Sequence, residues 1–221
     1  MRIQRFRRPL RLRGSRGAAR ALTVLLGLLC AFPARGQTIP ENAWSFSASL
    51  YGYLLPEGPD YLQPTVTADR GWLHLEARAN YEALNTGSVW MGYTVGGGKK
   101  LVWDLTPMIA GVFGGIDGVA PGYRGSLTWG KLGLYSEGEY VIHPADSSEN
   151  FFYNWSEATV SPVAWFRVGL VTQRTRAYQS DRDIQRGLLI GVERNAWELT
   201  GHVFNPDESR PTVVIALRVN F

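Results

Sequence analysis

The sequence predicts an all-β protein that folds as a single closed antiparallel barrel of about 12 strands. Three observations lead to this prediction. Apolar and polar residues alternate along most of the chain, and a period of two is the period of a β-strand. The connections between the alternating segments are short and long in turn. Tryptophans gather beside predicted turns and chain ends.

Residues 1–36 form a predicted secretory signal peptide, which leaves 37–221 as the predicted barrel domain. An arginine-rich start is followed by an apolar run over 21–32, which is too short to span a bilayer as a helix. Ala34-Arg35-Gly36 then supplies small residues at the spacing that a signal peptidase accepts. A lipoprotein site at Cys30 and a twin-arginine signal at Arg7-Arg8 fit the flanking residues less well.

Removal of this segment reverses the net charge. Residues 1–36 hold nine arginines and no acidic residue, so 14 of the 23 basic residues remain against 19 acidic ones, and +4 becomes −5. The basic character belongs to the targeting segment, and a nucleic-acid partner is therefore not expected. The only cysteine, Cys30, leaves as well, so the domain has no disulfide framework.

The domain divides into segments with strand character, separated by turn residues. Ten strands are the alternative, if 61–69 or 120–129 is not a strand. The predicted strands are 44–55, 61–69, 71–82, 87–97, 99–113, 120–129, 131–143, 151–161, 163–176, 184–194, 196–205 and 211–221.

The connections alternate in length, as they do when short periplasmic turns lie opposite longer external loops. An even strand count then places both ends of the domain on the periplasmic side. Tight turns are predicted at Asp69-Arg70, 96–98, Gly130-Lys131, Ser161-Pro162 and Asn195-Ala196. The longer connections are 56–60, 83–86, 114–119, 144–150, 177–183 and 206–210.

The two faces of a strand can be separated by parity. In the segment 71–82, Leu73 and Leu75 alternate with residues such as His74 and Glu76. A soluble β-sandwich also alternates, so the tryptophans decide between the two classes. They lie near predicted turns or chain ends, as a membrane-interface girdle requires. These residues are Trp44, Trp72, Trp103, Trp129, Trp165 and Trp197.

The last ten residues, 212–221, alternate strictly and end on Phe221 at the free carboxylate. This ending resembles the C-terminal signature of bacterial outer-membrane β-barrels, with Val219 and Phe221 as the insertion signal. Ala216 stands where that class usually has glycine. The resemblance covers the mature chain at the level of pattern and points to no single family. It implies an outer-membrane location, contact with membrane lipid and lipopolysaccharide, and recognition of the last strand by the barrel-assembly machinery.

Extending strand registers across the turns places charged residues side by side on the polar face of seven neighbouring strands. The expected neighbours are Arg124 with Glu137, Glu137 with Glu157, Glu157 with Arg167, Arg167 with Glu193, Glu193 with Glu198, and Glu198 with Arg218. Such a belt either fills the lumen with paired charges or forms a constriction that filters solutes. Four glutamates against three arginines predict weak cation preference or tolerance of zwitterions. The belt consists of Arg124, Glu137, Glu157, Arg167, Glu193, Glu198 and Arg218.

A second lumen cluster is predicted from His74, Glu76, Arg78 and Asp104. Gly92 is expected between Arg78 and Asp104, so that the arginine reaches across the glycine to the aspartate.

The function that fits these features best is a narrow, porin-like channel for ions or small polar solutes. A closed structural or surface-interaction barrel is the first alternative, and a lipid-modifying outer-membrane enzyme is the second. The sequence contains no nucleophile elbow and no HExxH spacing. We therefore predict no catalytic residue, metal or cofactor.

Overall fold

The computed structural model describes residues 43–145, 147, 150–177 and 183–221. The predicted signal peptide, 1–36, lies outside the described residues and remains a prediction. Among the residues described, no helix is long and apolar enough to cross a membrane. The strands are β1 (Ser45–Leu54), β2 (Tyr61–Arg70), β3 (Leu73–Ala79), β4 (Thr86–Tyr93), β5 (Val95–Gly97), β6 (Leu101–Gly114), β7 (Gly118–Trp129), β8 (Leu132–Val141), β9 (Phe151–Val163), β10 (Phe166–Ala177), β11 (Asp183–Arg194), β12 (Trp197–Phe204) and β13 (Thr212–Asn220).

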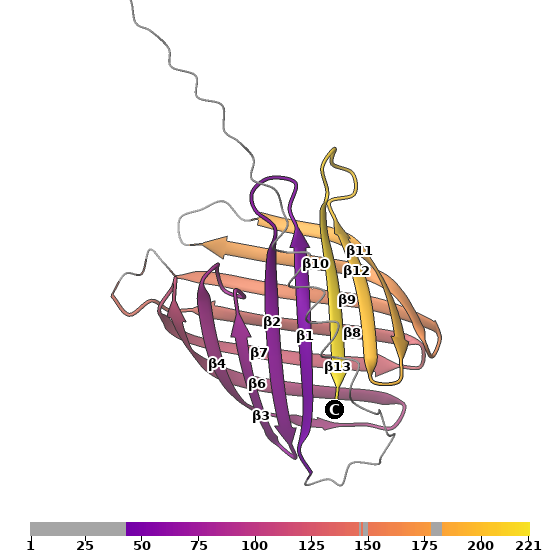
Figure 1. Cartoon of the computed structure of the whole chain (residues 1–221). Coiled ribbons are helices and arrows are strands. Elements are labelled where there is room, and N and C mark those ends of the chain that lie inside the picture. The colour runs from indigo at the N-terminus through magenta and orange to yellow at the C-terminus, as the bar shows by residue number, and fades with distance from the viewer. Residues whose placement is uncertain (1–42, 146, 148–149, 178–182) are drawn as a thin grey trace, which may run out of the picture. The chain divides into compact units, whose positions relative to one another are not determined.

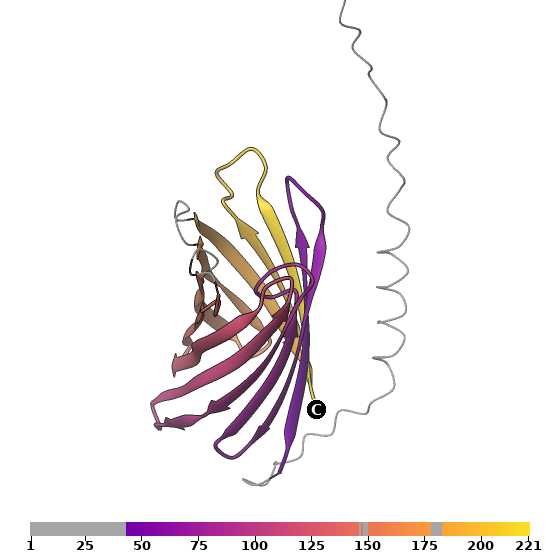
Figure 2. The same cartoon turned by 90° about the vertical axis from the view of Figure 1, so that its left-hand side faces the viewer.

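The strands form one antiparallel sheet that closes on itself (Figures 1 and 2). Neighbours in sequence pair around the wall, β1 pairs with β13, and β4 pairs with β6 to complete the ring. The short β5 continues the line of β4 after Thr94 and also pairs with β6. Counted as one strand, β4 and β5 give a twelve-stranded barrel within the described part of the chain. The predicted fold class is confirmed, and the ten-strand alternative is wrong because 61–69 and 120–129 both lie in strands.

The C-terminal strand joins the two ends of the barrel domain. Its apolar and polar faces separate as the alternation predicts, because Val214 and Ala216 are buried inside and Ile215 is 49% exposed outside. The final aromatic belongs to the ladder, since the Phe221 N–H donates to the Phe46 carbonyl at 2.8 Å. The predicted signal residue Phe221 thus lies at the β1–β13 seam.

Five tight turns lie at one end of the barrel, and the longer connections lie at the other. We call these the tight-turn end and the long-loop end. Three predicted turns are displaced along the chain. β2 runs through Arg70 and turns at Gly71-Trp72, and β5 occupies 95–97, so that the next turn falls at 98–100. β9 runs through Pro162 to Val163 and turns at Ala164-Trp165. Proline is tolerated there because the β8 pairing ends at Val160, so no ladder partner needs a proline N–H.

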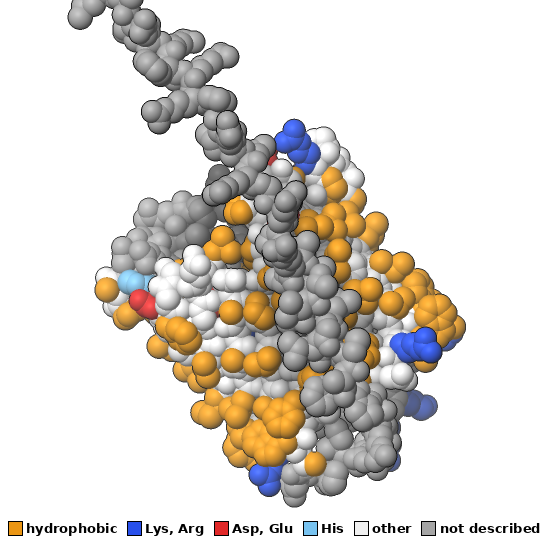
Figure 3. Space-filling view, in the orientation of Figure 1, with side chains coloured by type: hydrophobic (Ala, Val, Ile, Leu, Met, Phe, Trp, Pro, Cys, Tyr) orange, Lys and Arg blue, Asp and Glu red, His pale blue; other side chains and the backbone are white. Residues whose placement is uncertain are grey.

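The outer wall is apolar, and Figure 3 shows hydrophobic side chains across it, with the visible charged side chains near its margins. Leu170, Leu188 and Ile190 are more than half exposed on this face. Tryptophans surround the tight-turn end, where the girdle is predicted. Their exposed fractions are 39% for Trp44, 57% for Trp72, 42% for Trp103, 62% for Trp129 and 61% for Trp165, and Trp197 is half-buried.

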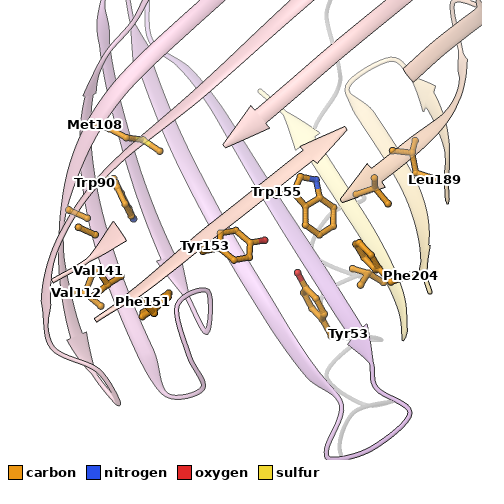
Figure 4. Packing of buried hydrophobic residues seen from close by; sticks show 14 residues of the cluster. Tyr53, Trp90, Met108, Val112, Val141, Phe151, Tyr153, Trp155, Leu189 and Phe204 are labelled. Atoms are coloured by element: carbon orange, nitrogen blue, oxygen red, sulfur yellow. The ribbon is translucent and has the colours of Figure 1, made fainter. Parts of the chain in front are cut away.

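The lumen is filled unevenly along its length. Its long-loop half contains buried apolar and aromatic side chains, and Figure 4 shows them in two groups with Tyr153 between. One group includes Trp90, Val112, Val141 and Phe151, and the other includes Tyr53, Trp155, Leu189 and Phe204.

A charge on the outer wall should destabilise the barrel. Leu170 lies in mid-strand on β10 and faces outward, so Leu170→Arg should lower the free energy of unfolding in lipid vesicles by about 2–4 kcal/mol. The same substitution at the exposed loop residue Leu84 is the control and should leave stability nearly unchanged. Equal stabilities for the two variants in denaturant titrations would contradict a lipid-facing wall.

Candidate functional site in the barrel lumen

A polar cavity of about 180 Å³ lies inside the barrel. Its lining comes from nine strands and from Tyr81 of the loop after β3, and phenols, hydroxyls and charged groups predominate. The nine strands are β1, β2, β3, β7, β8, β9, β10, β12 and β13. Six of the seven residues of the predicted belt line this cavity, and Glu193 does not. The charged lining residues are Glu76, Arg124, Glu137, Glu157, Arg167, Glu198 and Arg218.

The first charge cluster is centred on Glu76 of β3, and we call it the Glu76 cluster. The Glu76 carboxylate accepts from Arg78 Nε at 2.6 Å, and its other oxygen lies 3.0 Å from His74 Nε2. His74 Nδ1 lies 2.6 Å from Asp69 Oδ1. A histidine with a carboxylate at each ring nitrogen satisfies both only as the imidazolium, which donates from both nitrogens. Arg124 adds a longer contact to Glu76, at 3.8 Å.

Arg78 links the Glu76 cluster to the opposite wall. Its guanidinium donates to Glu139 of β8 at 2.9 Å, and both side chains are at most 2% exposed. The guanidinium also lies over two rings, 4.1 Å from the Tyr81 centroid and 4.5 Å from the Trp90 centroid. A desolvated guanidinium gains from such cation–π contacts. Arg78 is therefore held by two carboxylates and two aromatic faces.

The second charge cluster is centred on Glu157 of β9, and we call it the Glu157 cluster. One carboxylate oxygen accepts from Trp155 Nε1 at 3.0 Å and lies 3.1 Å from His202 Nε2. The other accepts from Arg167 Nη1 at 3.0 Å. Arg167 Nη2 also donates to Glu198 at 2.5 Å, so that one guanidinium bridges two carboxylates. Charge-assisted bonds of this kind make burial of the ions tolerable.

A glycine makes room for the bridging arginine. Gly191 lies opposite Arg167 on β11, and a Cβ there would come within 2.7 Å of Arg167 Nε and 2.9 Å of its Cγ. The Arg167 side chain thus lies over the glycine backbone. It reaches Glu157 although the ladder partner of Glu157 is Val171, four residues along β10.

Glu137 lies between the two clusters and is held by phenols. It accepts from Tyr81 at 2.5 Å and from Tyr135 at 2.7 Å. Burial raises the pKa of the Tyr81 phenol well above its ordinary value, so the hydroxyl stays protonated and donates to the carboxylate.

The predicted belt is partly right in register. Arg124 is opposite Glu137, and Glu198 is opposite both Glu193 and Arg218. Three predicted ladder pairs are wrong, namely Glu137 with Glu157, Glu157 with Arg167, and Arg167 with Glu193, although the Arg167 side chain still contacts Glu157. The ladder places Trp155 opposite Glu137, Val171 opposite Glu157 and Gly191 opposite Arg167. The misplaced β9–β10 turn and the variable geometry of the longer loops explain these shifts.

Glu193 is a correction to the belt itself. It shares the inward parity, but it lies exposed beside the turn between β11 and β12 and does not line the cavity. The bridging partner of Arg167 is instead Glu198.

The second predicted cluster is also corrected. His74, Glu76 and Arg78 do lie together, but Asp104 belongs elsewhere, because Gly92 pairs with His74 and Met108, while Asp104 pairs with Gly96. Asp104 accepts a hydrogen bond from Ser126. Arg78 therefore turns to Glu76 and Glu139 and does not reach Asp104.

Sequence reasoning missed three contributors to the site. Glu139 follows Glu137 at the strand period, so parity alone would have placed it inside. His202 is inward by the same rule, but its contact with Glu157 depends on the register of four strands. Tyr81 falls in the predicted strand 71–82 on the outward face of Leu73 and Leu75, and this prediction is wrong, because β3 ends at Ala79 and Tyr81 enters the lumen from the following loop.

The lining can hold small polar molecules by hydrogen bonds and charge. Four glutamates and three arginines face the cavity, so its charge is nearly balanced with a small acidic excess. In the described part of the chain, no group of three or more histidine, cysteine or acidic side chains is arranged to hold a metal ion.

Comparison with known proteins bears on the fold. No family model and no curated protein sequence matches the chain. A solved structure of the KdgM porin superposes with a TM-score of 0.55 at 11% sequence identity, over 79% of this chain and 99% of that one. The chain shares the barrel fold of the KdgM porin. A second structure, of the KdgM porin in complex with disordered oligogalacturonate, gives the same TM-score at 10% identity and the same coverage. The predicted class of bacterial outer-membrane β-barrels is confirmed at the level of the fold.

Removing Arg78 should test the Glu76 cluster. Arg78→Ala leaves the carboxylates of Glu76 and Glu139 buried without their cation, and should reduce the free energy of unfolding by about 3–5 kcal/mol. The control is Arg210→Ala, because Arg210 and Glu57 form an exposed pair at 3.9 Å that should contribute less than about 1 kcal/mol. Denaturant unfolding of both variants measures the difference. Equal losses would mean that the Glu76 cluster does not stabilise the barrel.

Proposed function

We propose that the protein is a narrow channel of the outer membrane for ions and small polar solutes, with the charged lumen as its constriction. One observation carries the proposal. An apolar outer wall encloses a cavity lined by opposed charges and phenols, and a structural barrel does not need such a cavity. The likeness of the fold to the KdgM porin supports the same interpretation.

The solutes that fit the lining are small, and are either cationic, zwitterionic or neutral and hydroxylated. Oligogalacturonate, which is in complex with the KdgM porin in the second structure, is an acidic sugar chain. We do not extend that ligand to this lumen, because the lining has four glutamates and three arginines. An acidic chain would meet net repulsion here, while a zwitterion can pair with both signs.

A closed barrel is the second candidate, and the packing of the long-loop half favours it. Trp90, Val141, Phe204 and Val214 are fully buried inside the wall. If side chains fill that half completely, the barrel conducts nothing. Its function would then lie at its surface.

An enzyme does not fit the lumen well. Glu76 and Glu157 are each bound by an arginine and a histidine, an arrangement that keeps carboxylates ionised and engaged in salt bridges.

We also propose contact of the wall with outer-membrane lipid and lipopolysaccharide, and recognition of Val219 and Phe221 by the barrel-assembly machinery. The resemblance of the C-terminal strand to the outer-membrane class supports both.

Single-channel recording tests the proposal. Protein purified from the outer membrane and reconstituted in a planar bilayer should give discrete current steps, and its reversal potential in a salt gradient should show weak cation preference. A folded, heat-modifiable barrel that gives no current, and that does not accelerate solute entry into vesicles, would overturn the channel and favour the closed barrel.

Arg167 is the residue whose loss should change ion selectivity most clearly. Arg167→Ala removes the cation that bridges Glu157 and Glu198, so the lining becomes more acidic and cation preference should rise. Stability should fall by about 3 kcal/mol or more, because Glu157 stays buried with one partner fewer. Arg210→Ala in an exposed loop is the control for loss of an arginine. An unchanged reversal potential in Arg167→Ala would remove the Glu157 cluster from the constriction.

A further inference from the structure

The loop between β3 and β4, residues 80–85, is held in a fixed conformation at the wall. Asn80 and Asn85 both adopt left-handed backbone angles, with φ of 56° and 60°, which asparagine tolerates better than most residues. The Asn80 N–H donates to the Thr86 carbonyl at 2.8 Å, and the Asn80 side chain accepts from the Asn85 N–H at 2.9 Å. The same side chain donates to the Leu62 carbonyl of β2 at 2.9 Å. The loop is therefore tied to its own base and to the neighbouring strand.

This anchoring directs one aromatic side chain of the loop into the lumen. Tyr81 lines the central cavity, and its hydroxyl donates to Glu137 of β8 at 2.5 Å. Its ring meets Tyr153 of β9 edge-on, with centroids 5.2 Å apart. Around the wall, β4, β6 and β7 separate β3 from β8. The side chain therefore spans the bore and does not lie along the wall beside its own strand.

Neighbouring phenols extend this crossing. Tyr153 interacts with Tyr53 of β1 as well as with Tyr81. The Arg78 guanidinium lies over the face of the Tyr81 ring, 4.1 Å from its centroid. A row of buried side chains thus runs from the β3–β4 loop past β9 to β1. Its three phenols belong both to the lining of the charged cavity and to the apolar packing of the long-loop half.

We propose that Tyr81 is the size-limiting residue of the lumen. The β3–β4 loop holds its ring across the bore and so sets the largest solute that passes. The inference rests on the proposed channel function, and it assigns steric selection to Tyr81 while charge selection stays with the glutamates and arginines. Leu84 of the same loop is 46% exposed and takes no part.

Three variants distinguish the effect of the Tyr81 ring, the effect of its hydroxyl hydrogen bond and the effect of a change elsewhere in the loop. Tyr81→Ala removes the ring, Tyr81→Phe keeps the ring without the hydroxyl, and Leu84→Ala alters the loop at its exposed side. Tyr81→Ala should raise single-channel conductance by about twofold or more and admit larger neutral sugars in vesicle-swelling assays. Tyr81→Phe and Leu84→Ala should keep the size limit of the wild type. A size limit in Tyr81→Ala equal to that of the wild type would overturn the proposal.

A thiol reporter gives a readout that needs no current. Ser49 of β1 lines the cavity, so Ser49→Cys in a Cys30→Ser background carries the only thiol of the chain. Membrane-impermeant maleimides of two sizes are added to intact cells from the external side. The small reagent should label with or without Tyr81, and the bulky one should label only in Tyr81→Ala. Equal labelling by the bulky reagent in both backgrounds counts against Tyr81.

The two proposals fail in distinguishable ways. If the wild type conducts and Tyr81→Ala is unchanged, only the size-limiting role is overturned. If the wild type is silent and Tyr81→Ala conducts, the open channel is overturned and Tyr81 is the block. If neither conducts and labelling is unchanged, both proposals are overturned. Heat-modifiable migration in gels shows that each variant is folded.

Discussion

Every other feature of this molecule depends on closure of its backbone hydrogen-bond ladder. An outer-membrane barrel has no water in the bilayer core to satisfy an open sheet edge, so the first and last members of the sheet order must meet. Here β4 and β6 meet in the middle of the chain, and β1 and β13 join the ends. Closure fixes an inside and an outside for each strand. Charged residues in the strands must then face inward, and inside they must find partners.

The sequence could predict the two faces because strand parity survives most register errors. Glu137 meets Trp155 where Glu157 was expected, and Arg167 meets Gly191 where Glu193 was expected, and both are shifts of two residues. A shift by an even number leaves every side chain on its own face. A shift of the strand pairing by an odd number of residues would turn the charged side chains toward the apolar exterior, which costs much free energy. The alternation therefore predicts which side chains face inward, but it does not predict which residues pair across the strands.

The partners inside the lumen could not be predicted in the same way. Tight turns such as Gly130-Lys131 define a register, and the pair Arg124–Glu137 follows from it, yet Arg124 turns to Glu76. An arginine side chain is long enough to reach several carboxylates. Which carboxylate it contacts depends on the space that the neighbouring side chains leave free. Gly191 leaves such space for Arg167. The inward position of Tyr81 depends on two asparagines in left-handed conformations, which no periodicity reveals.

A twelve-stranded wall lies between the small barrels that side chains fill and the wide barrels that leave an open aqueous channel. In this protein the lumen is divided along its length into a packed part and a part with a cavity. Apolar side chains such as Trp90 and Phe204 pack the long-loop half and stabilise the wall from inside. Ion pairs and phenols occupy the middle, where a cavity remains. In the channel proposed above, permeation therefore depends on the side chains where the packed half meets the polar cavity more than on the diameter of the barrel. Tyr81 comes from the β3–β4 loop and not from a strand, so its ring can cross the lumen while the strands of the wall keep all their ladder pairs.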